Sequence, residues 1–198
     1  MVSPTVIRFK YHVEKFIKTV AYLSQKGVPD LDKLKISKLV YFADKFHLVA
    51  FGRPILGDTY YALPYGPVPT LSKDIMEDAS ESEVTDSPDS NVDKLLESLE
   101  VSHTGRYPTF KAKEGIDFAD LSESETEILD KVVEKYGTKT GRQLINITHE
   151  EKAWRETDKN DAIDFRLMFD GPDEEHNRLR IELLEEDQED REFFEYIR

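Results

Sequence analysis

The amino-acid sequence predicts a mainly α-helical protein with a small β element, in which a compact helical domain surrounds one central buried helix. Several segments repeat apolar residues at the 3.6-residue period of an α-helix. One of them runs from residue 30 to residue 51, and its centre, residues 39–43 and 46–51, is apolar on almost every side, which is typical of a helix covered by other elements. Glycines, prolines and helix-capping residues separate these segments.

The first predicted helix carries an apolar stripe and ends before a Gly-Val-Pro break at residues 27–29. The stripe consists of Phe9, Val13, Phe16, Ile17 and Val20. The second, central helix begins after Asp30, which is well placed to cap it. It ends at Gly52, because glycine readily adopts the left-handed conformation that closes a helix.

An extended, aromatic-rich segment is predicted for residues 57–63, followed by a stiff turn at 64–69, where three prolines exclude a helix. Residues 74–93 hold eight acidic residues and no basic one, so we expect an acidic solvated loop there, or a frayed helix end. Residues 95–101 and 106–112 flank a polar turn and indicate a hairpin. A helix continuing through Leu99 also fits the leucine spacing.

Two helices joined by a short turn are predicted between residues 122 and 148, because capping-box patterns begin at Ser122 and Thr140. We expect one domain over residues 1–165 and an acidic helical C-terminal extension over 166–198. The extension ends in an apolar cluster after an all-polar stretch at 185–192. That end either folds back on the domain or docks on a partner, and the sequence leaves both alternatives open.

Composition and charge narrow the function classes. The chain has 198 residues and a net charge of −14. It contains no cysteine, which excludes disulfides and favours a reducing, cytoplasmic location. No apolar run approaches the roughly 20 residues of a membrane-spanning helix, so no membrane partner is expected. Residues 1–57 carry a balance of +6, residues 58–170 of −13 and residues 171–198 of −7. This acidic majority argues against nucleic acid and favours a basic protein partner.

No catalytic or metal-binding pattern is present in the sequence. The five histidines are scattered without a metal-ligand spacing, and neither a phosphate-binding P-loop nor a dinucleotide motif occurs. We therefore expect no enzyme activity, no metal and no cofactor. His47 lies within the central predicted helix and is interpreted first as a core histidine.

Four blocks of sequence in one order resemble the Panacea domain, also called the SocA-like antitoxin domain. They are residues 38–42 (KLVYF), 46–48 (FHL), 52–56 (GRPIL) and 65–68 (YGPV). Residues 121–125, 135–137 and 148–154 are similar to the second half of that family, so the resemblance spans roughly residues 8–157. It implies an antitoxin of a bacterial or phage toxin–antitoxin system that neutralises a co-encoded toxin by direct binding. It also implies two alternatives, a proteolytic adaptor that delivers the toxin to a protease and a DNA-binding regulator.

The candidate partner-binding residues are mainly aromatic, because aromatic side chains dominate binding hot spots. They are Tyr60, Tyr61, Tyr65, His47, Trp154, Phe193, Phe194 and Tyr196. The alternative for the tyrosines is that their turn only closes against the central helix. A second alternative makes residues 123–148 a helix-turn-helix with Arg142, Gln143 and Asn146 facing bases, although their acidic surroundings favour a purely structural helix pair.

Overall fold

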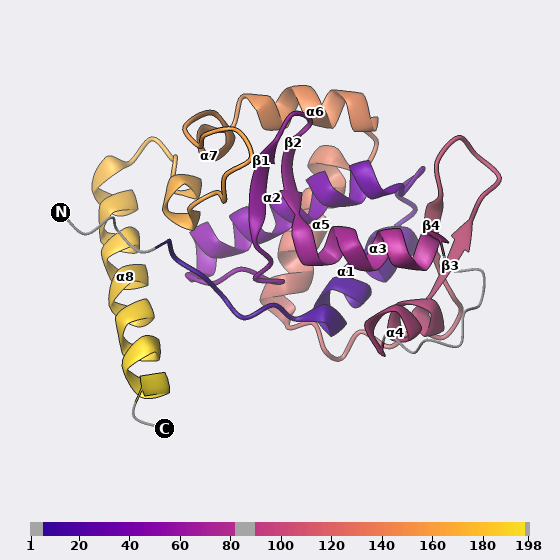
Figure 1. Cartoon of the computed structure of the whole chain (residues 1–198), viewed down its shortest axis with the longest axis horizontal. Coiled ribbons are helices and arrows are strands. Elements are labelled where there is room, and N and C mark those ends of the chain that lie inside the picture. The colour runs from indigo at the N-terminus through magenta and orange to yellow at the C-terminus, as the bar shows by residue number, and fades with distance from the viewer. Residues whose placement is uncertain (1–5, 82–89, 197–198) are drawn as a thin grey trace.

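The computed structural model describes residues 6–81 and 90–196, except for the side chains of 90 and 192–196, and it confirms the mainly α-helical fold class (Figure 1). The elements are α1 (Val13–Gln25), α2 (Lys33–Phe51), β1 (Tyr60–Leu63), β2 (Gly66–Pro69), α3 (Thr70–Glu81), α4 (Ser90–Ser98), β3 (Leu99–Ser102), β4 (Thr109–Ala112), α5 (Glu123–Tyr136), α6 (Gly141–His149), α7 (Lys152–Arg155), the 3₁₀ helix η1 (Phe165–Met168) and α8 (Glu174–Tyr196). The strands form two separate antiparallel hairpins.

Helix α2 is the buried centre of the domain, as predicted, and it contacts α1, α3, α5, α6 and β2. Asp32 caps its N-terminus, because the Asp32 carboxylate accepts a hydrogen bond from the Lys35 backbone N–H at 2.8 Å. The prediction that Asp30 caps this helix is wrong, since Asp30 lies in the turn before it with φ 52°. Gly52 ends the helix as predicted, with φ 76° and its N–H bound to the Leu48 carbonyl oxygen.

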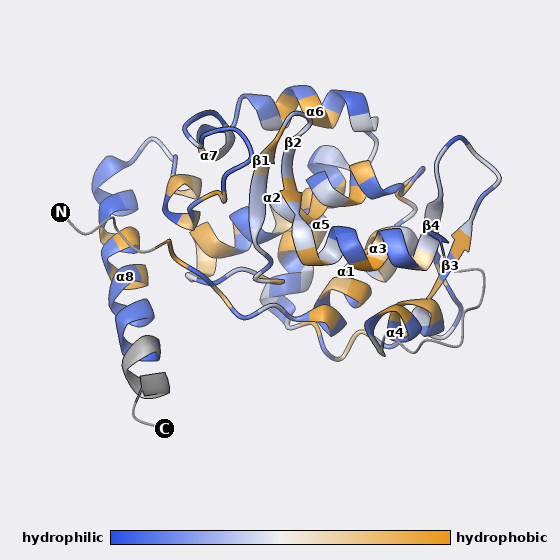
Figure 2. Ribbon diagram, in the orientation of Figure 1, coloured by the Kyte–Doolittle hydropathy of each residue, from blue (hydrophilic) through white to orange (hydrophobic). Residues whose placement is uncertain are grey.

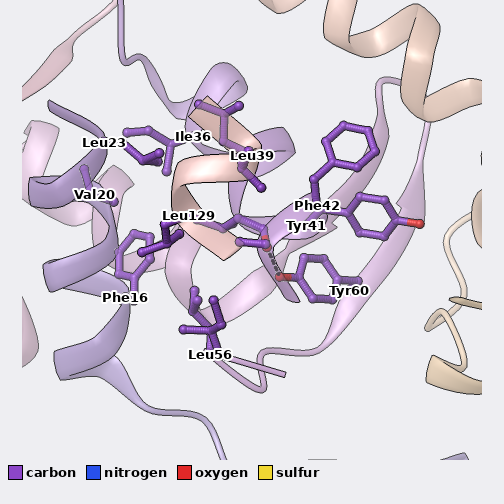
Figure 3. Packing of buried hydrophobic residues seen from close by; sticks show 14 of the residues in the cluster. Phe16, Val20, Leu23, Ile36, Leu39, Tyr41, Phe42, Leu56, Tyr60 and Leu129 are labelled. Atoms are coloured by element: carbon purple, nitrogen blue, oxygen red, sulfur yellow. Dashed lines mark hydrogen bonds between the residues drawn. The ribbon is translucent and has the colours of Figure 1, made fainter. Parts of the chain in front are cut away.

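The hydrophobic core lies where α1, α2 and α5 meet (Figure 3). Phe16 of α1, Leu39 of α2 and Leu129 of α5 are fully buried. Phe42 of α2 stacks on Tyr136 of α5 with the ring centroids 4.1 Å apart. Because burying each such side chain contributes about 1.5–3 kcal/mol, the packing of these helices around α2 is the main source of stability.

The segment predicted to be extended with a proline-rich turn forms the β1–β2 hairpin. Leu63 pairs with Gly66, so the turn consists of Pro64 and Tyr65. The free edge of β1 is covered by residues 160–163, where the Ile163 N–H donates to the Tyr60 carbonyl oxygen at 2.8 Å. The hairpin is therefore attached to the chain that follows α7.

The predicted hairpin is confirmed as β3–β4, and the helix that precedes it ends at Ser98 instead of continuing through Leu99. Strand β4 is also bound to the chain before α2, because the Phe110 N–H donates to the Leu31 carbonyl oxygen at 2.9 Å. This bond holds the β3–β4 hairpin beside the start of the central helix.

The acidic stretch predicted as a loop over residues 74–93 is helical at both ends. Helix α3 continues to Glu81, and α4 begins at Ser90. The reason is an apolar stripe under the acidic residues, since Ile75, Met76 and Ala79 are all buried in the core. Residues 82–89 lie outside the described part of the chain.

Both predicted capping boxes are present, one formed by Ser122 and Glu125 at the start of α5 and one by Thr140 and Gln143 at the start of α6. The core continues past residue 165 into the predicted extension, because Met168 and Phe169 are also buried.

Helix α8 lies at one end of the molecule beside the N-terminal segment (Figure 1), and most of its surface is hydrophilic (Figure 2). Leu184 is 3% exposed and joins the core, whereas Leu179 and Leu183 are 49% and 59% exposed. Only a narrow stripe of α8 therefore packs on the domain. The predicted aromatic anchors Phe193, Phe194 and Tyr196 have side chains outside the described residues. Among the helices described, none combines the length and apolar character needed to cross a membrane.

Candidate partner-binding site

An apolar groove of about 520 Å³ lies between the tips of the two hairpins and the first turns of α2. We call it the tyrosine groove. Its apolar lining consists of Leu34, Leu63, Tyr65, Val68, Tyr107 and Ile145. Its remaining lining residues are Asp32, Lys33, Ser37, Pro64, Lys73, Glu77 and Pro108.

The β1–β2 turn that forms one wall of the groove is fixed from below. Gly66 has φ 94°, and a Cβ there would lie 2.5 Å from the Thr148 hydroxyl oxygen and 3.0 Å from Lys38 Nζ, so only glycine fits between α2 and α6. Lys38 is fully buried, and its ammonium donates to the Pro67 carbonyl oxygen at 2.7 Å. Burial lowers the pKa of Lys38 to about 7. These contacts hold the turn so that Tyr65 projects outward.

Two tyrosines on different hairpins stand exposed at the groove. Tyr65 is 68% exposed and Tyr107 is 57% exposed. The guanidinium of Arg106 lies 5.3 Å from the centre of the Tyr107 ring. Aromatic side chains bury a large area at a low entropic cost, so two exposed tyrosines beside an apolar groove are typical of a protein-binding surface.

The charges at the rim of the groove balance one another. Glu77 accepts hydrogen bonds from Lys33 at 3.2 Å and from Lys73 at 2.5 Å. The Lys73 ammonium lowers the pKa of Glu77, which keeps this carboxylate charged. Asp32 is the fourth charged lining residue, and it is used as the cap of α2. Two lysines and two carboxylates leave no net charge, so the groove suits an apolar segment of a partner.

The predicted site residues are divided between this groove and the interior. Tyr65 lies in the groove, whereas Tyr61 is half-buried and bridges to Ala162 on the other side of β1. Tyr60 does not belong to an exposed cluster, because its side chain is fully buried and its hydroxyl donates to Asp44 at 2.9 Å. Alternation along a strand explains the difference, since neighbouring side chains point to opposite faces.

Trp154 and His47 hold the fold in place. Trp154 is half-buried, stacks on His149 with centroids 4.0 Å apart, and donates its indole N–H to the Leu63 carbonyl oxygen at 2.9 Å. It therefore positions the tyrosine turn indirectly. His47 is fully buried, which agrees with its interpretation as a core histidine and leaves its side chain no exposed surface for a partner.

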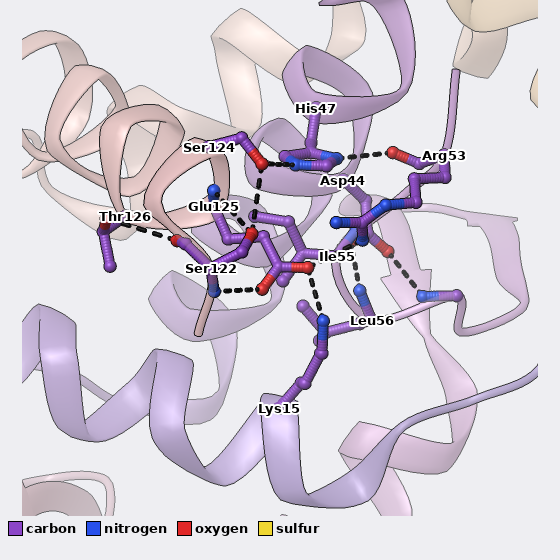
Figure 4. Close-up of polar contacts among 11 residues, drawn as sticks. Lys15, Asp44, His47, Arg53, Ile55, Leu56, Ser122, Ser124, Glu125 and Thr126 are labelled. Carbon is purple, nitrogen blue, oxygen red and sulfur yellow. Dashed lines mark hydrogen bonds and ion pairs between the residues drawn. The ribbon is translucent and has the colours of Figure 1, made fainter. Parts of the chain in front are cut away.

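The buried polar side chains of α2 bind the loop that follows the helix (Figure 4). His47 Nδ1 lies 2.6 Å from the Arg53 carbonyl oxygen, so this nitrogen donates and Nε2 accepts from the Ser124 hydroxyl at 3.1 Å. Burial lowers the pKa of His47, which favours this neutral form. Asp44 accepts the N–H groups of Ile55 and Leu56 at 2.9 and 2.7 Å. Each group is hydrogen-bonded within the fold.

Sequence reasoning did not identify Tyr107, Leu34 or Ile145 as groove residues. The sequence predicted Tyr107 within a strand, whereas in the structure it lies in the turn between β3 and β4, because β4 begins only at Thr109. The available signal was the Tyr-Pro pair at residues 107–108, since proline disfavours a strand interior and a large aromatic in a polar turn has no core to enter. The helix-turn-helix alternative is not favoured by the contacts of α6. Gln143 accepts the Thr140 backbone N–H at 2.9 Å and is used by its capping box. Within the described residues, no group of acidic and histidine side chains could hold a metal ion.

Comparison with known proteins identifies the family. A family model described as "Antitoxin SocA-like, Panacea domain" matches residues 36–155, which is more than half of the 198 residues. No curated protein and no solved structure matches the chain. The matched range extends from α2 to α7 and includes both tyrosines of the groove, while α1 and α8 lie outside it. The chain belongs to the SocA-like antitoxin family of Panacea domains.

Proposed function

We propose that the chain is an antitoxin that neutralises a co-encoded toxin protein in the cytoplasm by binding it directly. Membership of the SocA-like antitoxin family supports this function class. The tyrosine groove is the observation that supports a specific contact surface, because two exposed tyrosines lie beside its apolar lining. The contact is therefore an apolar or aromatic segment of the toxin seated between Tyr65 and Tyr107.

Charge outside the groove sets the speed of association. The groove has a neutral rim, but the chain as a whole carries a net charge of −14. Complementary fields mainly accelerate encounter, whereas the desolvated apolar contact determines how long the complex lasts. With a basic toxin, the association rate should therefore fall as salt increases, and the dissociation rate should change less.

We propose that the chain acts by binding and not by turnover of a substrate. This is supported by the use of its buried titratable groups. The carboxylate of Asp44 and the imidazole of His47 both bind the loop that follows α2, away from the tyrosine groove. A purified chain that turned over a substrate would contradict the proposal.

The direct test is co-expression with the neighbouring gene, read out as rescue of growth and as co-purification. The double variant Tyr65→Ala, Tyr107→Ala should lose both, while its melting temperature stays close to that of the wild type because both side chains are exposed. Leu183→Ala is the matched control, since it removes a large apolar side chain that is 59% exposed on α8, outside the groove. Equal loss of binding in the control, or full binding by the double variant, would refute the groove as the contact.

Purified components separate direct neutralisation from the two alternatives. A direct antitoxin should inhibit its toxin in a mixture that contains only the two proteins. Inhibition that appears only after addition of a protease would identify a proteolytic adaptor instead. Binding of the free chain to DNA from its own promoter region would indicate a regulator.

A further inference from the structure

A second pocket, of about 260 Å³, lies between the N-terminal segment, the start of α1, the loop after α2 and α8. We call it the cationic pocket. Its charged or titratable lining residues are Lys10, His12, Lys15, Arg53, Arg191 and Asp187. It lies apart from the tyrosine groove and shares no lining residue with it.

The backbone brings these side chains together by a close approach of two segments. The His12 N–H donates to the Leu56 carbonyl oxygen at 2.9 Å. Gly57 has φ 71°, and a Cβ there would lie 2.5 Å from the Lys10 carbonyl oxygen, so a larger residue would separate the segments. The pocket wall is therefore part of the fold and not a chance gathering of long side chains.

Two of the cations are held in place by a buried carboxylate beneath the pocket. Glu125 is fully buried and forms ion pairs with Lys15 at 2.5 Å and with Arg53 at 2.7 Å (Figure 4). A lysine has three N–H donors and an arginine has five, so each keeps donors beyond those given to Glu125. Arg53 remains 48% exposed, which leaves its planar group accessible to a ligand.

The charge balance of the pocket specifies the kind of ligand. Lys10, Lys15, Arg53 and Arg191 carry four positive charges, against the carboxylates of Asp187 in the wall and Glu125 below. Two positive charges are left over in a chain whose net charge is −14. Asp187 already pairs with Arg191 at 3.1 Å, and Lys10 forms no ion pair with any described residue.

We propose that the cationic pocket binds the phosphate group of a small molecule. A phosphate carries about −1.5 to −2 charges at pH 7 and three acceptor oxygens, which matches the surplus of two positive charges. Arginine recognises phosphate through two parallel N–H donors, and Arg53 presents such a group to the pocket. Arg191 adds a positive charge from α8, where its Nε and Nη2 atoms already bind Asp187 and Gln188. A carboxylate ligand would compensate only one of the two charges. Bound phosphate would connect α1, the loop after α2 and α8.

His12 provides a direct report on the ligand. Its imidazole makes no capping hydrogen bond to α1, and it lines the pocket. Burial and the positive charges of Lys15 and Lys10 lower the pKa of His12, while the carboxylates of Glu125 and Glu14 act in the opposite direction. A bound dianion favours the imidazolium form, so the pKa of His12 should rise when phosphate binds.

The test is a titration of the full chain with inorganic phosphate, at an ionic strength kept constant with sodium chloride, followed by the NMR signals of the histidine rings. We expect a saturable shift and a raised pKa at His12, with no change at His103, which is exposed and does not line the pocket. The melting temperature should also rise with phosphate relative to chloride, because a ligand of the native state stabilises it. Equal responses to phosphate and chloride would overturn the proposal, and so would equal responses to acetate.

Variants locate the site. Lys10→Glu should weaken phosphate binding at least tenfold without unfolding the chain, since Lys10 is exposed. Lys111→Glu makes the same charge change at an exposed lysine of β4 that does not line the pocket, and it should leave phosphate binding unchanged. Arg53→Lys keeps a cation for Glu125 but removes the two-donor group, and it should also weaken binding. Equal affinity in Lys10→Glu and Lys111→Glu would show that phosphate binds elsewhere, and the proposal would be wrong.

Discussion

Replacement of Glu125 by glutamine should change how the stability of the domain depends on pH. Burial of this carboxylate raises its pKa, but hydrogen bonds from Lys15, Arg53 and the Ser122 backbone N–H outweigh burial and lower the pKa from 4.5 to about 2. A folded-state pKa below the unfolded value means that the ionised group stabilises the native state at neutral pH. That contribution is lost as the pH falls from about 5 towards 2.

The size of the effect follows from the pKa shift. One pKa unit corresponds to about 1.4 kcal/mol, so the full shift is equivalent to roughly 3 kcal/mol. Solvent reaches the two partners, since the Lys15 and Arg53 side chains are 24% and 48% exposed, and this screening reduces the value. We therefore expect Glu125→Gln to destabilise the protein by about 1.5–2 kcal/mol at pH 7 and by much less at pH 3.

The assay is urea unfolding of wild type and Glu125→Gln at a series of pH values. Glu127→Gln is the matched control, because Glu127 lies one half-turn away on the same helix and makes only an exposed ion pair with Lys131. Its difference from the wild type should be small at every pH. If the difference between wild type and Glu125→Gln is the same at pH 3 as at pH 7, the ion pairs of Glu125 do not stabilise the fold and the reasoning fails.

Three further predictions concern other parts of the chain. The pKa of Lys38 is lowered to about 7, so between pH 7 and the unfolded pKa near 10.5 the unfolded chain binds more protons than the folded chain. In urea unfolding, the stability of the wild type relative to Lys38→Met should therefore rise by on the order of 1–2 kcal/mol from pH 7 to 9, and a constant difference would contradict this. Gly66→Ala should lower the melting temperature more than Gly27→Ala, because both glycines have positive φ but only Gly66 lacks space for a Cβ. An equal decrease in melting temperature for both variants would show that the β1–β2 turn can adjust. In urea unfolding, Leu184→Ala should destabilise the chain by about 2 kcal/mol, because Leu184 is 3% exposed, and Leu183→Ala by less than about 0.5 kcal/mol, because Leu183 is 59% exposed. Similar values for the two variants would mean that α8 does not pack as described.

The sequence was sufficient to predict the helices that carry a strong apolar period and clear caps. The central helix, both capping boxes and the β3–β4 hairpin lie where the residue pattern placed them, and the segment predicted to be extended before a proline-rich turn forms the β1–β2 hairpin. The exact ends of the helices were harder to predict, because neighbouring residues can serve equally well as caps. Asp30 and Asp32 are both good capping residues, and only the turn with positive φ at Asp30 assigns the cap to Asp32. Likewise, the high acidic content of α3 suggested a loop, although Ile75, Met76 and Ala79 form an apolar stripe that is buried where α3 packs on α2.

The candidate site was only partly predictable, because it depends on contacts between distant segments. Tyr65 was identified from its turn, but Tyr107 joins it only because β4 is bound to the chain before α2. The sequence alone also does not reveal which of the adjacent residues Tyr60 and Tyr61 faces the core. Tyr60 is the one that faces the core, where Asp44 accepts its hydroxyl hydrogen bond, and this partner 16 residues earlier is one that no local pattern indicates.

The polar residues of α2 explain how one helix positions both proposed sites. Lys38 binds the Pro67 carbonyl oxygen and so fixes the wall of the tyrosine groove. Asp44 and His47 bind the backbone of residues 53–57, which forms part of the cationic pocket. Buried polar groups of this kind rarely add stability compared with apolar residues of the same size, but each must find its partner, so they select one arrangement of the loops. Lys38→Met tests this directly, because it should keep the domain folded while the tyrosine turn loses its anchor and toxin binding weakens.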